Sequence, residues 1–332
     1  DYIAAAKGLI KTGIANPKNV FMMGNRMAGG VVLSALMQEK TPFVGGIVIS
    51  PVTDLVNYNK AVVERYMKQH GAPAGYRTNS AVGNAKNIKG KLLIVHSMND
   101  GMDDFLGAFD EKSIVGIMGG HGLLRTDPEY LKVALVSKKL TESGCVMVSG
   151  GGPGAMEATH LGAWLAGRDD SAVHEAVEIL SAAPSFRDEL WLETAFRVMV
   201  AFPHPEYVSL GVPTWLYGHE PATPFATHIA KYFDNSTRED LILTIAKGGV
   251  IYSPGSAGTM QEIFQDAVQN HYLSFGYASP MVFLGEHFWM DEMPVYRLMQ
   301  HLVEKGKYKN LLLSITDDID QIVSTITAFR NS

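Results

Sequence analysis

Two glycine-rich stretches decide the fold of this chain: residues 146–157 read VMVSGGGPGAME, and residues 249–262 read GVIYSPGSAGTMQE. In each, a short apolar run typical of a buried β-strand leads into glycines and then into a helix-forming segment. Such a turn leaves backbone N–H groups free at the positive end of a helix, which suits a phosphate group. Two turns of this kind in one chain therefore predict a nucleotide ligand.

The alternation of strand and helix continues on both sides of the two turns. Strands are expected at residues 113–118, 145–149, 208–216, 249–253, 281–284 and 311–315. Asp127 followed by Pro128 marks the start of a helix, because Asp is a good N-cap and Pro suits the first helical position. Repeated β-α units with buried strands predict an α/β fold with a doubly wound parallel sheet. Ligands of such sheets bind at the carboxyl ends of the strands.

The balance of charge changes near residue 102. Residues 1–102 carry twelve Lys and Arg against five Asp and Glu, whereas residues 103–332 carry sixteen against twenty-nine. This shift predicts two domains, at residues 1–102 and 103–332. The acidic second domain is unsuited to nucleic acid, whose phosphates need Lys and Arg. We therefore expect no nucleic-acid partner.

The composition is that of an ordinary globular protein, with 46% hydrophobic and 19% charged residues. No apolar run reaches the roughly 18 residues of a membrane span, so no membrane partner is expected. The single cysteine, Cys145, lies in an apolar strand pattern and cannot form an internal disulfide, which favours a cytoplasmic protein. No spacing of Cys and His suggests zinc, and we expect neither a metal nor a cofactor.

The first hundred residues also alternate between strands and helices, which indicates a second parallel sheet. Four segments are distinctive: residues 23–29 (MGNRMAG), 46–54 (GIVISPVTD), 64–67 (ERYM) and 92–100 (LLIVHSMND). They resemble the C-terminal part of the hydrolase domain of the prolyl oligopeptidase family, most closely its dipeptidyl-peptidase branch. The resemblance implies an incomplete α/β-hydrolase-like segment ahead of the second domain.

The chemistry of that family does not follow from these residues. A nucleophile elbow has Ser at the centre of G-x-S-x-G, but this position is Arg26, and Ala28 replaces the second glycine. Asp100 matches the position of the family's acid, but no His follows at the usual separation. Because an arginine stays protonated and cannot attack a carbonyl, a serine-peptidase-like hydrolase is only the third alternative.

The second glycine turn carries groups suited to chemistry as well as binding. Ser256, Thr259 and Glu262 are spaced by three and share one face of the helix that opens there. Hydroxyl groups can bind a phosphate, whereas a carboxylate beside a phosphate is unfavourable, so Glu262 is expected to point toward a sugar. Two plainer interpretations stay open: the glycines only turn tight corners, and Glu262 only complements the helix dipole.

Residues 150–156 (GGGPGAM) and 254–262 (PGSAGTMQE) resemble the paired signatures of the LOG ("lonely guy") family. The family's second motif is P-G-G-x-G-T-x-x-E, and Ser256 replaces its second glycine. The resemblance covers about residues 112–330 and implies a Rossmann-like fold and a homodimer. Many members hydrolyse the N-glycosidic bond of nucleoside 5′-monophosphates to free base and ribose 5-phosphate. The Ser256 replacement and a long insert around residues 168–207 keep a non-catalytic nucleotide-sensing module as the alternative.

Taken together, the turns and the resemblance define a candidate site for an AMP-like substrate or ligand. Glu262 is the expected catalytic carboxylate, because positive charge builds up on the sugar as the glycosidic bond breaks. Arg238, the closest match to an arginine of the family, would assist at the phosphate or the departing base. The residues expected to bind the nucleotide and its phosphate are Gly150, Gly151, Gly152, Gly154, Met156, Glu157, His121, Gly255, Ser256, Gly258 and Thr259.

Plainer roles also stay open for three of these candidates. Arg238 could be an ordinary surface arginine at a helix start. His121 could have a purely structural role in its loop. Glu157, in the first turn of its helix, could only complement the dipole.

Overall fold

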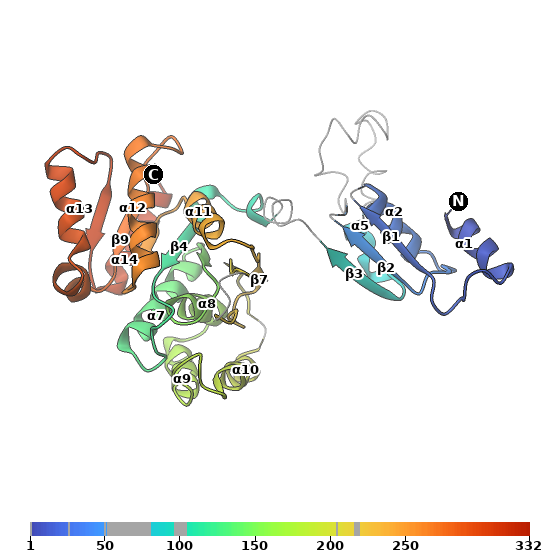
Figure 1. The fold of residues 1–332 in the computed structure, drawn as a ribbon. Helices are drawn as coiled ribbons and strands as arrows, with labels where there is room; N and C mark the ends of the chain where they lie inside the picture. Colours follow the sequence, from blue (N-terminus) through green and yellow to red (C-terminus); the bar gives the residue numbers. More distant parts are fainter. Residues whose placement is uncertain are drawn as a thin grey trace. The chain divides into compact units, whose positions relative to one another are not determined.

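The computed structural model describes most of the chain, with gaps. The described residues are 2–25, 27–49, 51, 81–95, 105–203, 205–215 and 220–332. The chain divides into two compact units, Asp1–Asp104 and Phe105–Ser332. Figure 1 colours the first unit in blue to teal and the second from green to red. Each unit is built on a parallel sheet of its own.

The first unit contains a three-stranded parallel sheet with the order β1-β2-β3. Its elements are α1 (Tyr2–Lys11), β1 (Phe21–Asn25), α2 (Met27–Leu36), β2 (Gly45–Ile49), α5 (Ala81–Asn84), η1 (Ala85–Asn87) and β3 (Lys91–Val95). Val32 and Leu36 of α2 are buried in one cluster with Val48 of β2, so this helix covers one face of the sheet. Arg26 and Asp100, the nucleophile and acid positions of the hydrolase pattern, lie outside the described residues. So do residues 52–54, 64–67 and 96–100, which carry part of the expected resemblance.

The second unit contains a seven-stranded parallel sheet with the order β10-β9-β8-β4-β5-β6-β7. Its strands are β4 (Ile114–Met118), β5 (Val146–Ser149), β6 (Ser209–Gly211), β7 (His228–Ile229), β8 (Val250–Tyr252), β9 (Pro280–Phe283) and β10 (Leu312–Ile315). All neighbouring strands run parallel. The predicted α/β fold with a doubly wound, Rossmann-like sheet is therefore confirmed.

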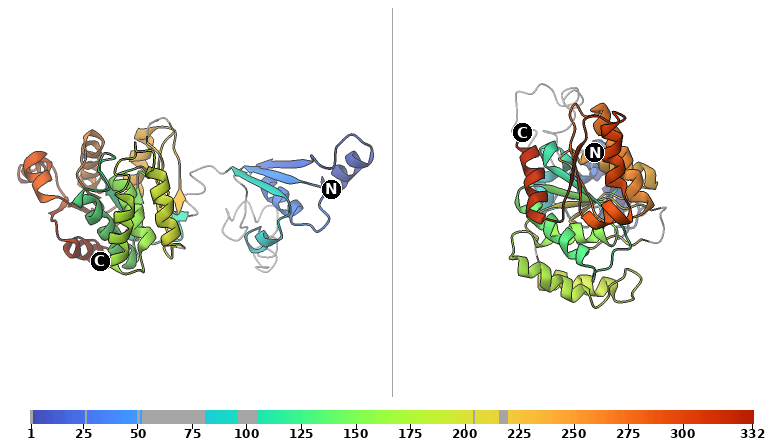
Figure 2. Two further views of the ribbon diagram at one scale, coloured as in Figure 1. Left: turned by 90° about the horizontal axis from the view of Figure 1, so that it is seen from below. Right: turned by 90° about the vertical axis from the view of Figure 1, so that its left-hand side faces the viewer.

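Helices cover both faces of this larger sheet. They are α7 (Pro128–Glu142), α8 (Ala155–Leu165), α9 (Asp170–Leu180), α10 (Trp191–Ala201), α11 (Asn235–Ile245), α12 (Ala257–Tyr272), α13 (Val295–Glu304) and α14 (Ile319–Arg330), with the short helices η2 (Glu111–Ser113) and η3 (Phe288–Glu292). Val115 and Ile117 of β4 pack with residues of α7, α8 and α14 in the main core. Gly116 points to the opposite face, where it meets Ala246 after α11. Figure 2 shows α13 in red and the pair α9 and α10 in yellow-green at opposite ends of this unit.

No helix within the described residues combines the length and the hydropathy that crossing a membrane requires.

The winding of the second unit places both glycine turns beside its central strand. From β4 the chain proceeds through β5, β6 and β7 on one side and then returns to β8, β9 and β10 on the other. The two turns follow β5 and β8, which are the two neighbours of β4. Because the strands are parallel, their carboxyl ends share one edge, and the reversal of strand order at β4 leaves a crevice there.

Candidate functional site

The loop that follows β4 touches both glycine turns. Gly120 donates its N–H to the carbonyl of Pro254 at 3.0 Å and accepts from the N–H of Ala155 at 3.2 Å. A Cβ atom on Gly119 would lie 2.7 Å from the Cβ of Ala155 and 2.8 Å from the hydroxyl of Ser253. Only a residue without a side chain fits between the turns at this distance. The two turns thus lie side by side, with the β4 loop between them.

A cleft of about 520 Å³ opens beside this junction. Its lining residues are Gly119, Gly120, His121, Met156, Glu220, Arg238, Glu239, Ser256, Ala257, Gly258, Thr259 and Glu262. Arg238 and Glu220 also line an adjoining hollow of about 240 Å³, together with Gly150 and Gly152 of the first turn. The structure therefore brings most of the predicted site residues together from four separate segments of the chain.

The second turn presents the N-terminus of α12 to the cleft. The side chain of Ser256, the N-cap, makes no capping hydrogen bond. The first N–H groups of a helix have no partner inside it, so those of α12 remain available to a ligand. Gly255 is required here, because the side chain of Thr259 packs directly against its Cα and a Cβ atom would collide with it.

In the first turn, part of the backbone is already engaged. The N–H of Gly151 donates to the hydroxyl of Ser149 at 3.1 Å, and the carbonyl of Gly151 accepts from Thr223 at 2.8 Å. Within the described part of the chain, we find no acceptor for the N–H groups of Gly150, Gly152 and Gly154. The first turn thus offers fewer free amides than its glycine content suggests.

Arg238 lies directly over the first turn, where a Cβ atom on Gly150 would collide with its guanidinium group. The residue is 8% exposed, and its guanidinium group donates to the amide oxygen of Asn235. Its Nη2 lies 3.6 Å from Oε1 of Glu239. Among the described residues, its Nε and the Oε2 of Glu239 are buried without a hydrogen-bond partner. Such buried, unpaired polar atoms favour a polar ligand in the cleft.

Two buried carboxyl groups, those of Glu262 and Glu239, interact electrostatically with Arg238. Burial raises the pKa of Glu262 to about 8, with Arg238 acting to lower it and Glu239 acting to raise it. Burial also raises the pKa of Glu239, against the hydrogen bond that Asn235 donates to it. Two nearby carboxyls with raised pKa values are typical of sites that perform acid–base chemistry.

His121 and Glu157 occupy different places. His121 stands at the mouth of the cleft, with Nδ1 3.0 Å from Oε1 of Glu220. Glu157 is fully buried and points away from the cleft; it accepts from Nε of Arg125 at 2.8 Å and from the hydroxyl of Tyr130 at 2.9 Å. The structure therefore does not bring Glu157 to the nucleotide site with the other predicted residues, because its carboxylate is held on α8 by these two partners.

Sequence reasoning missed two acidic residues of the cleft. Glu239 follows Arg238 directly, and the run Ser236-Thr237-Arg238-Glu239 at a helix start was a usable signal. Glu220 lies in an irregular segment without a motif, so no sequence signal marked it.

Residues 1–104 match the prolyl oligopeptidase family. They are 32% identical over 103 residues to dipeptidyl peptidase 4 of Trichophyton equinum, and 30% identical over 105 residues to inactive dipeptidyl peptidase 10 of Rattus norvegicus. Each match covers 30% of this chain and only 13% of the relative's length. The similarity agrees with the expected hydrolase-like fragment at the start of the chain.

Solved structures with a similar fold include a molybdenum cofactor binding protein and a molybdenum cofactor carrier protein. The molybdenum cofactor binding protein of Rippkaea orientalis is 16% identical, covers 65% of this chain and 95% of its own, and has a TM-score of 0.39. The molybdenum cofactor carrier protein of Chlamydomonas reinhardtii is 15% identical, covers 66% and 99%, and has a TM-score of 0.41. Similarity at this level does not identify a ligand for this chain.

Proposed function

We propose that the second unit binds a nucleoside 5′-monophosphate in the cleft and hydrolyses its N-glycosidic bond to free base and ribose 5-phosphate. One observation carries this proposal: α12 presents uncapped N–H groups at its start and a buried carboxylate, Glu262, about one turn further along the same helix. An anion site and an acid group are thereby held at a fixed separation by a rigid element.

The phosphate is assigned to the second turn. The N–H groups of Ala257, Gly258 and Thr259 lie at the positive end of the α12 dipole, where an anion is favoured. The hydroxyl of Ser256 lies at the same point. Arg238, which also lines the cleft, adds a permanent positive charge.

Glu262 is assigned to the sugar. As the bond between C1′ and the base nitrogen breaks, its electron pair leaves with the base and positive charge develops on the ribose. The ionised form of Glu262, a minor form at neutral pH because burial raises its pKa to about 8, stabilises this charge, and Arg238 favours that form. The oxygen of a water molecule then bonds to C1′, and a proton of that water passes by way of the carboxylate to the departing base.

The test is incubation of the full chain with AMP, GMP, CMP or IMP, followed by chromatography for free base and ribose 5-phosphate. Loss of the catalytic carboxylate in Glu262→Gln should reduce base release by about 100-fold or more. The matched control is Glu304→Gln, at the exposed end of α13. Tight nucleotide binding without base release would favour the sensing module, for which the Ser256 replacement speaks. Absence of both binding and release would refute the proposal.

Two further expectations stay predictions: a homodimer in solution, which the resemblance implies, and a cytoplasmic location, which the single cysteine favours. Sedimentation of the full chain would test the first. A fluorophosphonate probe, which labels the nucleophile of serine hydrolases, would test the first unit for such activity. We expect no labelling, because Arg26 stands at the nucleophile position.

A further inference from the structure

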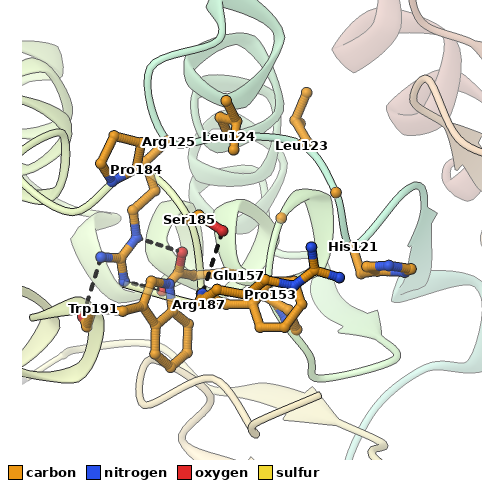
Figure 3. A pocket seen from close by; sticks show the side chains of 13 residues that line it. His121, Leu123, Leu124, Arg125, Pro153, Glu157, Pro184, Ser185, Arg187 and Trp191 are labelled. Atoms are coloured by element: carbon orange, nitrogen blue, oxygen red, sulfur yellow. Dashed lines mark hydrogen bonds and ion pairs between the residues drawn. The ribbon is translucent and has the colours of Figure 1, made fainter. Parts of the chain in front are cut away.

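A second cavity, of about 490 Å³, lies on the other side of the first glycine turn. We call it the lateral pocket. Its walls come from the β4 loop (residues 121–125), from Pro153 and Gly154, and from the connection between α9 and α10 (residues 184–191). Figure 3 shows these side chains surrounding the cavity. Its volume is close to that of the cleft.

The floor of the lateral pocket is rigidly built. Arg125 is 1% exposed and forms a buried ion pair with Glu157. Its Nη1 donates to the carbonyls of Ala183 and Trp191 and to the hydroxyl of Thr194, at 2.8–3.2 Å. The guanidinium group also lies over the Trp191 ring, 4.8 Å from its centroid. One side chain thus fastens the α9–α10 connection to α8, so the cavity keeps its shape without a ligand.

The upper wall is aromatic and carries an unneutralised cation. Arg187 extends across the pocket toward His121 (Figure 3), with its guanidinium carbon 5.3 Å from the centroid of Phe186. No carboxylate among the described residues lies within ion-pair distance of Arg187. The nearby carboxylate of Asp188 is occupied by the N–H of Ser185 at 2.8 Å. The pocket therefore presents the positive charge of the exposed Arg187 beside the partly buried ring of Phe186.

These surfaces select a ligand class. Aromatic rings of the protein stack on flat heteroaromatic rings, and an unpaired guanidinium group binds phosphate or carboxylate, often through two parallel hydrogen bonds. We infer that the lateral pocket binds a planar aromatic ring that carries an anionic group, as in the base and phosphate of a nucleotide unit.

The position of the lateral pocket connects it to the cleft. His121 lines both cavities. Pro153 and Gly154 of the first glycine turn line the lateral pocket, and Met156, just after that turn on α8, lines the cleft. A ligand with one phosphate at the start of α12 would reach the lateral pocket by passing the side chain of His121. The chemistry can therefore come from two sources: the second half of a dinucleotide that spans both cavities, or a separate mononucleotide. The first source rests on the proposed function, because its other half must occupy the cleft.

Calorimetric titration of the full chain distinguishes these sources. The probes are AMP and a dinucleotide in which two adenosine 5′-monophosphates are joined through a pyrophosphate. A charge-assisted contact with Arg187 should make the dinucleotide bind about tenfold or more tightly than AMP. Arg187→Ala should remove most of this ratio, and Arg187→Lys should restore part of it. The matched control is Arg197→Ala, on the exposed face of α10, which should leave the ratio unchanged.

Every outcome decides the inference. Binding of two AMP molecules per chain, with the second lost in Arg187→Ala, supports the pocket and identifies a separate mononucleotide. One AMP per chain without a dinucleotide advantage overturns the inference and leaves the proposed function standing. Dinucleotide binding that depends on Arg187 without any AMP binding supports the pocket and rejects the cleft as a mononucleotide site. Absence of binding to either probe rejects both.

Discussion

Replacing Glu262 by Gln should make the second unit more stable in alkali. The side chain is 7% exposed, and burial raises its pKa from an ordinary 4.5 to about 8. A carboxyl whose pKa is higher in the folded state binds more protons there than in the unfolded chain. The free energy of unfolding therefore falls as the pH rises from 4.5 to about 8 and stays low above that value. Gln has a similar shape and cannot ionise.

The magnitude follows from the size of the shift. A difference of one pKa unit corresponds to about 1.4 kcal/mol, so the raised pKa of Glu262 places an upper limit of about 5 kcal/mol on the cost of its ionisation. The positive charge of Arg238 offsets part of this cost, whereas the negative charge of Glu239 adds to it. We expect Glu262→Gln to exceed the wild type by about 2–4 kcal/mol in free energy of unfolding at pH 9, with little difference at pH 5.

Urea unfolding followed by tryptophan fluorescence measures this difference in the full chain. All four tryptophans, Trp164, Trp191, Trp215 and Trp289, lie in the second unit, so the signal reports on that unit alone. Glu304→Gln, at an exposed position, should run parallel to the wild type at both pH values. A stability difference between Glu262→Gln and the wild type that is the same at pH 5 and pH 9 would refute the reasoning.

Three further predictions concern the supports of the site. Gly150→Ala should weaken AMP binding by about tenfold or more, because a methyl group collides with the arginine over the turn; Gly8→Ala, which meets open space on α1 of the first unit, is the control in the same titration. Glu157→Gln should lower the free energy of unfolding by about 3–5 kcal/mol, since it breaks a buried ion pair, and an unchanged urea midpoint would contradict this. Burial lowers the pKa of His160 to about 3, so this residue alone should lower the free energy of unfolding by about 2 kcal/mol between pH 7 and pH 5 as the unfolded chain takes up a proton, opposite in sign to the contribution of Glu262. The stability difference between His160→Gln and the wild type should therefore change by about 2 kcal/mol between these two pH values, and a constant difference would count against it.

Much of the second unit could be predicted from local patterns. Buried strands of a parallel sheet are continuous apolar runs, and those at β4, β5 and β8 stand out between glycines and helix starts. β7 was missed because its two residues, His228 and Ile229, are both exposed and leave no apolar run. β6 ends at Gly211, earlier than predicted, two residues before Pro213, which has no N–H for the ladder.

Some features of the candidate site depend on residues close in sequence and others on residues far apart, and only the first kind could be predicted. The roles of Gly255 and Thr259 follow from neighbours in one turn, which spacing reveals. The partner of Glu157 is Arg125, thirty-two residues away, and no periodicity connects the two. The raised pKa of Glu262 results from burial by other segments, partly offset by Arg238. The sequence therefore identifies the carboxyl group but does not predict its pKa.

The attachment of Arg125 has a consequence for shortening or transplanting this fold. The insert between α8 and β6, which contains α9 and α10, is a segment that protein engineers would remove to obtain a minimal scaffold. Removing this insert would remove three of the oxygen atoms that accept hydrogen bonds from Arg125, those of Ala183, Trp191 and Thr194. The insert thus helps to hold Arg125 and Glu157 beneath the first glycine turn. A chimaera that includes this turn should therefore also include the insert.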